Sequence, residues 1–443
     1  MGLEEGKARA TKATKQPSSP RKGFQWVSDL DWRLLLLLFF SLSILLFVSL
    51  SCSSSLRQIP SFVRHAAAIT ITKNHVLVPP LSADVALRKS ELTRSRIAVC
   101  LVGGARRFEL TGPSILDRIL DEYPNADLFL NSPLDPNSFK LSLLKFASRV
   151  ASFRVFKPTP IPETESQVRV LTAANSPNGI QGLLQYFNLV EGCLTMLESY
   201  QNEKGFTYDW IVRTRVDSYW SAPLDPNSFF PGEYVVPPGS SFGGLNDRLG
   251  IGDYNTSIVA LSRLSLIPTL DLLGYTGLNS ETAFKAQLTT HNTSFRTLAQ
   301  PFCIVTDRQY KFPPTQFGVP VAALSSVGPL SGAKCRPCKP MCTGPCMADV
   351  MLRLQKGWSW IPWRNGTVEL CDATGEWEEG WEGMFDGIVG ERLARFRKRI
   401  GEMDVNQCVE DFEELKGKTA HWEAPPFEEI CRLGLDPTYS DNS

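Results

Sequence analysis

The pattern of hydrophobic and polar positions begins with one long apolar run near the N-terminus. Residues 34–52 include no charged side chain. At about 1.5 Å per residue, a helix of this length crosses the hydrocarbon core of a bilayer. The apolar core of a cleaved signal peptide is shorter and lies closer to the start of the chain. The run therefore predicts a transmembrane helix over 34–52.

The charges on either side of this run predict its orientation. Lysines and arginines are frequent in residues 1–33, whereas residues 53–72 carry only Arg57 and Arg64 as basic residues. Positive charge is retained on the cytosolic side of a membrane. We therefore expect a single-pass type II membrane protein, with a basic cytosolic tail over 1–33 and the bulk of the chain in a lumen.

After a polar stem over 53–94, short apolar runs alternate with stretches of helical periodicity. The apolar runs, which are typical of buried strands, are 96–102, 126–132, 153–158 and 209–216. The helical stretches are 114–123, 138–150 and 179–201. Strands that alternate with helices predict an α/β domain with a largely parallel sheet, which we place at 95–334.

One short repeat lies just after two of these predicted strands. The sequence PLDPNSF occurs at 133–139 and again at 223–229. Pro, Asp and Asn form turns and start helices. Because the flanking sequences differ, the repeat indicates similar loop chemistry after two strands and no duplicated domain.

The composition changes at Cys335, and we treat 335–443 as a Cys- and Trp-rich C-terminal appendage. Its cysteines 335, 338, 342 and 346 have a spacing that differs from the usual paired zinc knuckles. In a lumen, disulfides are favoured over zinc, with partners that include Cys371, Cys408 and Cys431. The tryptophans of this region either stack on sugar rings or belong to a core or interface; they are 358, 360, 363, 377 and 381.

Composition excludes several classes of protein. The 443 residues are 43% hydrophobic and 21% charged, with a formal net charge of zero. These proportions are typical of a globular protein of one or two domains. A protein that binds nucleic acid needs an excess of basic residues, so the zero net charge argues against a nucleic-acid partner. The four histidines form no metal or triad spacing, and H-E-x-x-H does not occur. The sequence therefore argues against serine hydrolases and zinc proteases.

Cysteines and glycosylation sequons agree with a luminal location. Ten cysteines lie between Cys100 and Cys431, and an even number in a luminal domain indicates disulfides. The three N-x-[ST] sequons, at Asn255, Asn292 and Asn365, all follow the apolar run. We expect these asparagines to be glycosylated.

The strand in DWIVRTRVDSYW, residues 209–220, carries charge at every second position. Arg213, Arg215 and Asp217 share one face of the strand, about 7 Å from one to the next. Asp217 can pair with one arginine, and the other is then free for a phosphate or carboxylate. The alternative is an internal Arg–Asp ladder without a ligand.

Two glycine-containing stretches offer backbone that can approach a ligand closely. FGGLNDRLGIGDY, residues 242–254, combines four glycines with Asn246, Asp247, Arg248 and Asp253. GGARRF joins Gly103 and Gly104 to Arg106 and Arg107 at the end of the first predicted strand. The alternatives are a turn that caps the helix near Ser257 and a surface loop with solvated arginines.

Three of these motifs together resemble a known group of proteins. CLVGGARRF, DWIVRTRVDSYW and GGLNDRLGIGD are similar to segments of plant-type, single-span type II membrane proteins that carry a domain of unknown function and resemble GT-A fold glycosyltransferases. The similarity covers 96–336. It implies an α/β fold with a GT-A-like, Rossmann-like and mostly parallel sheet, preceded by one transmembrane helix and followed by the Cys- and Trp-rich appendage.

The resemblance also implies roles for the residues of these motifs. The nucleotide-sugar is expected against a cluster formed by Gly103, Gly104, Arg106, Arg107, Arg213, Arg215, Asp217 and Arg248. Asp247 is the first candidate for the general base that deprotonates the acceptor hydroxyl, and Asp253 is the second.

The sequence departs in one position from the metal-binding motif of the GT-A group. Its Asp-x-Asp motif holds Mn or Mg, which binds the diphosphate. Here Arg215 stands where the first aspartate is expected. Either Asp217 binds the metal with water ligands, or the arginines replace the cation.

The function implied is a glycosyltransferase of the Golgi lumen, anchored in the membrane, which transfers sugar from a nucleotide-sugar donor to a glycan or glycoconjugate acceptor. The alternative is a non-catalytic luminal scaffold or carbohydrate-binding protein on the same fold. The sequence leaves the donor sugar, the acceptor and the oligomeric state open.

Overall fold

The computed structural model describes residues 83–174, 176, 178–355 and 367–438. The chain divides into a unit over 1–78 and a unit over 79–443, and all of the described residues belong to the second unit. The predicted basic tail, the predicted span over 34–52, most of the predicted stem, Asn365 and three of the tryptophans lie outside the described residues.

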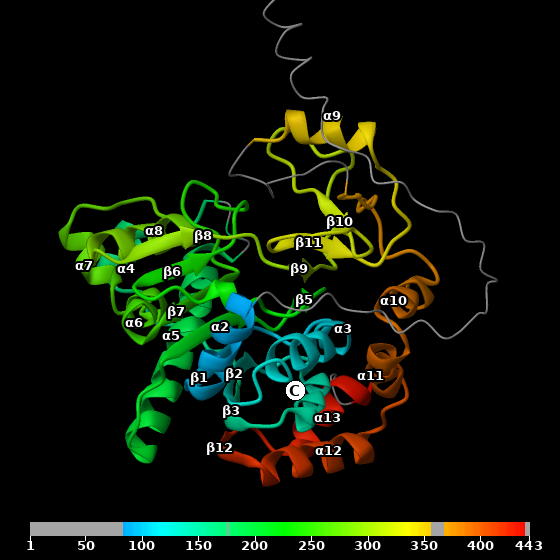
Figure 1. Cartoon of the computed structure of the whole chain (residues 1–443), viewed down its shortest axis with the longest axis horizontal. Coiled ribbons are helices and arrows are strands. Elements are labelled where there is room, and N and C mark those ends of the chain that lie inside the picture. The colour runs from blue at the N-terminus through cyan, green and yellow to red at the C-terminus, as the bar shows by residue number, and fades with distance from the viewer. Residues whose placement is uncertain (1–82, 175, 177, 356–366, 439–443) are drawn as a thin grey trace, which may run out of the picture. The chain divides into compact units, whose positions relative to one another are not determined.

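The main sheet contains eight strands in the order β12-β3-β2-β1-β4-β7-β6-β8 (Figure 1). The strands are β1 (Ile97–Val102), β2 (Ala126–Pro133), β3 (Val150–Phe156), β4 (Trp210–Arg215), β6 (Glu233–Val236), β7 (Leu249–Asp253), β8 (Ser294–Thr297) and β12 (Thr419–Glu423). Strand β7 pairs antiparallel with β4 and β6, and the other pairings are parallel. The sheet is therefore mixed, with a parallel half centred on β1.

Helices cover both faces of this half, which explains why β1 is apolar throughout. Ala98, Cys100 and Val102 face α5 (Gly179–Lys204) and α6 (Tyr254–Leu261). Val99 and Leu101 face the other layer. That layer includes α3 (Phe108–Ile115), which continues as a π-helical turn over Leu116–Leu120, and the 3₁₀ helix η2 (Ser138–Phe146). A disulfide joins Cys100 of β1 to Cys193 of α5.

The described residues include four further helices and one 3₁₀ turn before β8. The helix α2 (Ala83–Arg94) precedes β1 and contacts η3 (Pro226–Ser228), while α4 (Glu165–Val170) contacts α7 (Ile267–Leu272). Helix α8 (Ser280–Thr290) begins with a capping box in which the Asn279 side chain accepts from the backbone N–H of Thr282. This cap fixes where the first turn of α8 starts.

The first strand of a second sheet begins directly after β4. Its order is β10-β11-β9-β5, with β5 (Ser218–Trp220), β9 (Phe302–Val305), β10 (Val321–Ala323) and β11 (Ala333–Arg336). Only Val216 and Asp217 separate β4 from β5. The disulfide Cys303–Cys335 joins β9 to β11. The DWIVRTRVDSYW stretch therefore crosses from one sheet to the other at Asp217.

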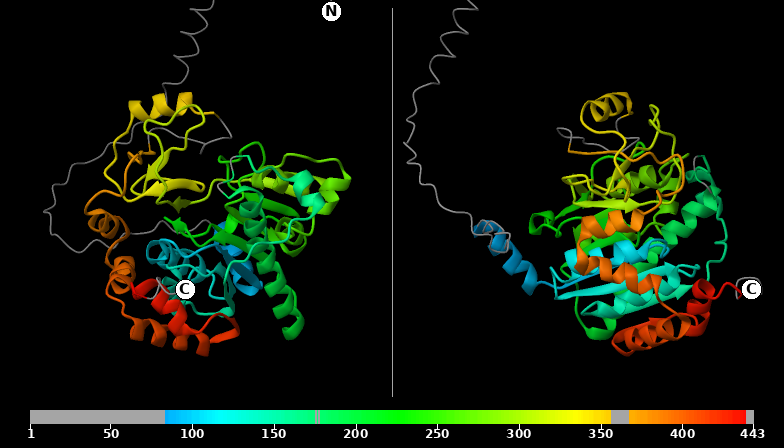
Figure 2. Two further views of the ribbon diagram at one scale, coloured as in Figure 1. Left: turned by 180° about the vertical axis from the view of Figure 1, so that it is seen from behind. Right: turned by 90° about the vertical axis from the view of Figure 1, so that its right-hand side faces the viewer.

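The C-terminal residues complete the main sheet. Helices α9 (Pro345–Arg353), α10 (Trp381–Val389), α11 (Glu391–Gly401), α12 (Val405–Gly417) and α13 (Phe427–Leu435) follow the second sheet. Strand β12 lies between α12 and α13 and pairs with β3, and Cys408 is bonded to Cys431. Figure 2 shows α11, α12 and α13, in orange and red, against the layer of α3 and η2.

The fold class expected from the sequence is wrong as stated. The chain is a mixed α/β protein whose eight-stranded sheet is mostly parallel, and the expected C-terminal appendage is part of that sheet. The boundary placed before Cys335 falls inside β11. In the part of the chain that the structure describes, no helix combines the length and the apolar character that a membrane span requires.

The expectation of disulfides is confirmed, but of the three expected partners of the clustered cysteines only Cys371 is correct, because Cys408 and Cys431 pair with each other. All ten cysteines from Cys100 to Cys431 are paired, and the remaining pairs are Cys338–Cys371 and Cys342–Cys346. The sulfur atoms of the four clustered cysteines are therefore held in disulfide bonds and are not available as zinc ligands. The even number of cysteines predicted pairing, but apart from Cys342–Cys346, which are four residues apart, the partners come from segments distant in the sequence.

Candidate functional site

A cavity of about 720 Å³ lies where β1 and β4 end and the second sheet begins. Carboxyl ends of neighbouring parallel strands are where open α/β sheets bind ligands. Five cationic side chains line the cavity, from the β1–α3 loop, β4, the β6–β7 loop, the β9–β10 loop and β11. They are Arg106, Arg215, Arg248, Arg308 and Lys334.

Asp217 lies beside the cavity and is paired with two of these arginines. Its carboxylate accepts from Nε and Nη2 of Arg215 at 2.8 Å each, and from Nη1 of Arg106 at 2.6 Å. Asp217 is 2% exposed. Burial alone would raise its pKa, but Arg215 and Arg106 outweigh burial and hold the pKa below its usual range. The carboxylate therefore stays ionised and orients both guanidinium groups.

The loop that carries Arg106 is held in a strained backbone conformation. Arg106 has a φ of 40°, in the left-handed region that costs a non-glycine residue energy. Its carbonyl accepts a hydrogen bond from Nζ of Lys140 at 2.7 Å, and its side chain pairs with Asp217. These two contacts keep the guanidinium of Arg106 at the rim of the cavity.

Two further cations, Arg248 and Lys334, line the same cavity. Nη1 of Arg248 donates to Oγ of Ser240 at 2.9 Å and to the carbonyl of Gly332. Lys334 of β11 forms no ion pair with the described residues. Burial, followed by the charges of Arg248 and Arg215, lowers the pKa of Lys334 well below its usual value. An anion in the cavity would relieve this repulsion.

Asp247 reaches the cavity from the β6–β7 loop. The hydroxyl of Ser280 donates to its carboxylate, and Tyr186 donates to its carbonyl at 2.9 Å. Burial alone would raise the pKa of Asp247, but Arg263 and Arg213 outweigh burial and lower it. Asp247 is therefore an ionised carboxylate on the cavity wall, as a general base requires.

Arg213 lies below the cavity and does not line it. It is fully buried on β4, and its Nη1 donates to the carbonyl of Asp247 and lies 3.4 Å from the hydroxyl of Tyr186. Arg213 and Arg215 therefore share one face of β4 as predicted, but only Arg215 reaches the cavity.

Glu281 is a cavity residue that the sequence analysis missed. It lies in the first turn of α8, half-buried and next to Ser280. Burial and then the charge of Asp247 raise its pKa to about 8. The only sequence signal was an acidic residue after Asn279, which is typical of a helix start and does not distinguish a ligand site from a cap.

Three residues of the GGARRF motif lie outside the cavity lining. Gly103 has a φ of 122°, and a Cβ at Gly104 would lie 2.6 Å from the carboxylate of Asp135. Arg107 turns away: its Nε donates to Asp307 at 2.8 Å, and its guanidinium lies 4.3 Å from the ring centre of Trp377. These glycines shape the loop, and Arg107 ties it to the C-terminal region.

The structure places Asp253 and the two described sequons away from the cavity. Asp253 is the N-cap of α6, where its carboxylate accepts from the backbone N–H of Thr256 at 2.9 Å and from that of Gly232 at 2.6 Å. Both oxygens thus have structural partners. Asn255 and Asn292 are exposed, so both are accessible to modification.

The residues around Asp217 do not fit a divalent cation. Both of its carboxylate oxygens accept from arginines, and its other charged neighbour is Lys334. Hard cations need several oxygen ligands. Among the described residues, no group of three or more His, Cys, Asp or Glu side chains is placed to hold a metal ion. The groups at this site that can neutralise a negative charge are therefore arginine and lysine side chains.

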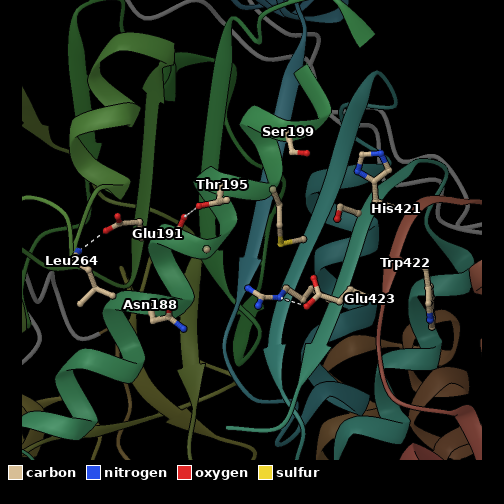
Figure 3. Close-up of a pocket in the computed structure, with 12 residues that line it drawn as sticks. Asn188, Glu191, Thr195, Ser199, Leu264, His421, Trp422 and Glu423 are labelled. Atoms are coloured by element: carbon tan, nitrogen blue, oxygen red, sulfur yellow. Dashed lines mark hydrogen bonds and ion pairs between the residues drawn. The ribbon is translucent and has the colours of Figure 1, made fainter. Parts of the chain in front are cut away.

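A second cavity, of about 480 Å³, lies between α5 and the edge strands β3 and β12. Figure 3 shows His421 and Glu423 on the side of β12 that faces α5, with Asn188, Glu191, Thr195 and Ser199 opposite. Its charged groups have partners: Arg154 donates to Glu423 at 3.0 Å, and Glu191 accepts from the backbone of Leu264. None of the sequence-predicted site residues lines this cavity.

The comparison with known proteins gives a family and no activity. No curated protein matches the chain. A family model described as a domain of unknown function (DUF7796) matches residues 92–437, which include every strand of both sheets. The chain therefore belongs to the DUF7796 family.

Proposed function

We propose that this protein is a glycosyltransferase of the secretory lumen, in the Golgi, that uses a nucleotide-sugar as donor and a glycan or glycoconjugate as acceptor. One observation carries the proposal. Arg106, Arg215, Arg248 and Lys334 converge on a single cavity at the ends of β1 and β4, and the ionised Asp247 lines the same cavity. An excess of cations facing a carboxylate suits a phosphorylated sugar.

The cationic wall matches a diphosphate in charge and in geometry. Arginine binds phosphate oxygens through two parallel N–H groups, and Asp217 already fixes the planes of two guanidinium groups. Lys334 adds a charge that has no ion-pair partner among the described residues. A bound diphosphate would neutralise these groups, which explains why they are retained next to one another.

In the proposed reaction, the acceptor hydroxyl loses its proton to the carboxylate of Asp247. The acceptor oxygen then forms a bond to the anomeric carbon of the donor, and the bond from that carbon to the diphosphate breaks. The arginines and Lys334 stabilise the negative charge that develops on the departing nucleoside diphosphate. No metal takes part in this scheme, because the cations of the wall replace it.

Five disulfides support the proposed compartment. Disulfides form and persist in oxidising compartments, and the ten cysteines from Cys100 to Cys431 are all paired. The competing role is a non-catalytic carbohydrate-binding or scaffold protein, and the absence of a metal-binding group among the described residues favours it over a metal-dependent enzyme. The ionised Asp247 in the same cavity as the cations favours catalysis.

Ligand binding tests the proposal directly. The unfolding midpoint of the full-length chain would be measured with UDP, GDP, CDP and inorganic pyrophosphate, each with and without Mn²⁺. We expect at least one nucleoside diphosphate to raise the midpoint equally in both conditions. The variant Lys334→Met should show a smaller rise than the wild type, whereas Arg296→Gln, which alters a surface arginine paired with Glu233, should show the full rise. No response to any nucleotide would refute the proposal.

A further inference from the structure

The cavity has two chemically different walls. Arg106, Arg215 and Lys334 lie on the wall formed by the β1–α3 loop, β4 and β11. Asp247 and Glu281 lie where the β6–β7 loop meets the first turn of α8. The proposed function assigns the cations and Asp247, and it leaves Glu281 without a role.

Contacts between the β6–β7 loop and the start of α8 join the two segments that carry the carboxyl groups. The N–H of Leu245 donates to the carbonyl of Glu281 at 3.1 Å, and the hydroxyl of Ser280 donates to the carboxylate of Asp247. A Cβ on Gly244 would lie 1.9 Å from the carbonyl oxygen of Glu281, so only glycine permits this approach. The β6–β7 loop and the start of α8 are therefore in direct contact beside the cavity.

Glu281 differs from the other carboxyl groups of this region in its partners. Asp217 is paired with two arginines, and Asp247 accepts from Ser280. Glu281 forms no ion pair with the described residues, although it is half-buried. A buried carboxylate without a counter-ion is costly, and the neutral acid avoids that cost.

The groups that face Glu281 act in opposite directions. Burial and the carboxylate of Asp247 favour the neutral acid, whereas Arg248 from the β6–β7 loop and Arg263 from the α6–α7 loop favour the ionised form. The first turn of α8 also favours the anion. Burial and Asp247 outweigh these charges and raise the pKa of Glu281 to about 8. Arg215 and Lys334 face the same cavity from β4 and β11.

We infer that Glu281 is a positioning residue of this cavity, which faces the ligand as a neutral carboxylic acid beside the ionised Asp247 and donates a hydrogen bond to a hydroxyl of the bound sugar. This inference rests on the proposed function. A neutral donor and an ionised acceptor side by side suit neighbouring hydroxyl groups, each of which both donates and accepts. The sugar end of the donor is thereby directed to Asp247 and Glu281, and the diphosphate end to the cations.

Two properties follow that a merely structural carboxylate lacks. Ionisation of Glu281 at alkaline pH adds a negative charge to the cavity and removes the hydrogen-bond donor. Ligand affinity should therefore fall as the pH rises past about 8. Lys334 also loses charge as the pH rises, because its pKa is lowered, so its contribution must be separated.

The first measurement needs no ligand. The unfolding midpoint of the full-length chain would be followed from pH 6 to pH 9.5 for the wild type and for Glu281→Gln, which mimics the neutral acid. We expect the wild type to lose stability relative to Glu281→Gln as the pH rises. Parallel curves for the two proteins would overturn the inference, whatever the ligand is.

The second measurement compares two kinds of ligand by calorimetry at pH 6.5 and pH 9. Pyrophosphate contacts only the cations, whereas UDP-glucose, UDP-galactose and GDP-mannose also present sugar hydroxyls. At pH 6.5, Glu281→Ala should bind at least one nucleotide-sugar about tenfold more weakly than the wild type and pyrophosphate equally well. Between pH 6.5 and pH 9, Glu281→Gln should lose less affinity than the wild type, and the Glu281→Gln, Lys334→Met double variant should lose least.

The outcomes separate the inference from the proposed function. If no nucleotide or nucleotide-sugar binds to the wild type, the proposed function and the sugar contact both fail, and the ligand-free curves still report whether Glu281 is neutral. If nucleotide-sugars bind and Glu281→Ala binds them as the wild type does, the proposed function stands and the inference is refuted.

Discussion

Asp217 accepts two hydrogen bonds from Arg215, two residues earlier in the chain, and a third from Arg106 in the loop after β1. The pair Arg215–Asp217 spans the point where the chain leaves the main sheet for the second sheet. The aspartate thus joins three segments and holds two guanidinium groups on the cavity wall. In the proposed function, Asp217 therefore acts through these arginines and not through a metal.

Replacing Asp217 by Asn should therefore destabilise the protein as well as weaken anion binding. The change leaves the half-buried guanidinium of Arg215 without its counter-ion, and loss of one partner of a buried pair costs about 3 kcal/mol. Denaturant titration measures this cost. Because the pKa of Asp217 is lowered, the stability that it provides is present above pH 4 or so and is lost as the pH falls below its usual pKa, about 3.9. The deficit of Asp217→Asn should therefore shrink at low pH.

Replacing Lys334 by Met should separate binding from stability. Lys334 is half-buried next to Arg248 and Arg215 and forms no ion pair with the described residues. Because its pKa is lowered, the charged amine costs stability at neutral pH, and that cost disappears as the pH rises towards the usual value for lysine. We expect the variant to unfold at a higher temperature than the wild type at pH 7 and to bind pyrophosphate about tenfold more weakly. A simultaneous loss of stability and affinity would contradict this account.

Local patterns were sufficient to locate several elements. The apolar runs at 96–102, 126–132 and 209–216 correspond to β1, β2 and β4. The two PLDPNSF copies form the same turn: Asp135 accepts from the N–H of Asn137 at 2.7 Å, and Asp225 from that of Asn227 at 2.8 Å. Such features depend on neighbours in sequence, so composition and spacing predict them.

Features that depend on distant segments were missed or misplaced. Strand β12 pairs with β3 across a separation that no local periodicity encodes, so the C-terminal region was taken for an appendage. Glu281 enters the cavity because Gly244 allows the β6–β7 loop to contact α8. Arg107, adjacent to Arg106, points to Asp307 and Trp377 instead of the cavity. The sequence therefore predicted which charged residues occur in the motifs, but not which of them line the same cavity.

The disulfide between Cys408 and Cys431 tests whether the C-terminal elements belong to the main fold. It joins α12 to α13 around β12, over a sequence separation of 23 residues. By loop-closure entropy such a bond contributes about 3 kcal/mol. The double variant Cys408→Ala, Cys431→Ala should lose about that much stability in the whole cooperative transition. A separate early transition, with the main one unchanged, would show that β12 docks as an independent appendage.

Gly244 tests the contact that brings Asp247 and Glu281 together. A methyl group at Gly244 would lie 1.9 Å from the carbonyl oxygen of Glu281 and 2.4 Å from the backbone nitrogen of Thr282, neither of which belongs to a flexible side chain. The β6–β7 loop must then move away from α8, and overpacking of this kind costs about 3 kcal/mol. Gly244→Ala should lower stability by that amount in denaturant titration and should weaken nucleotide-sugar binding more than pyrophosphate binding, because Asp247 is displaced from Glu281 whereas Arg106, Arg215 and Lys334 stay in place. Gly383→Ala in α10 is the matched control, since nothing lies within 4 Å of its added methyl group. Equal losses for both ligands in Gly244→Ala would mean that the two walls do not act separately.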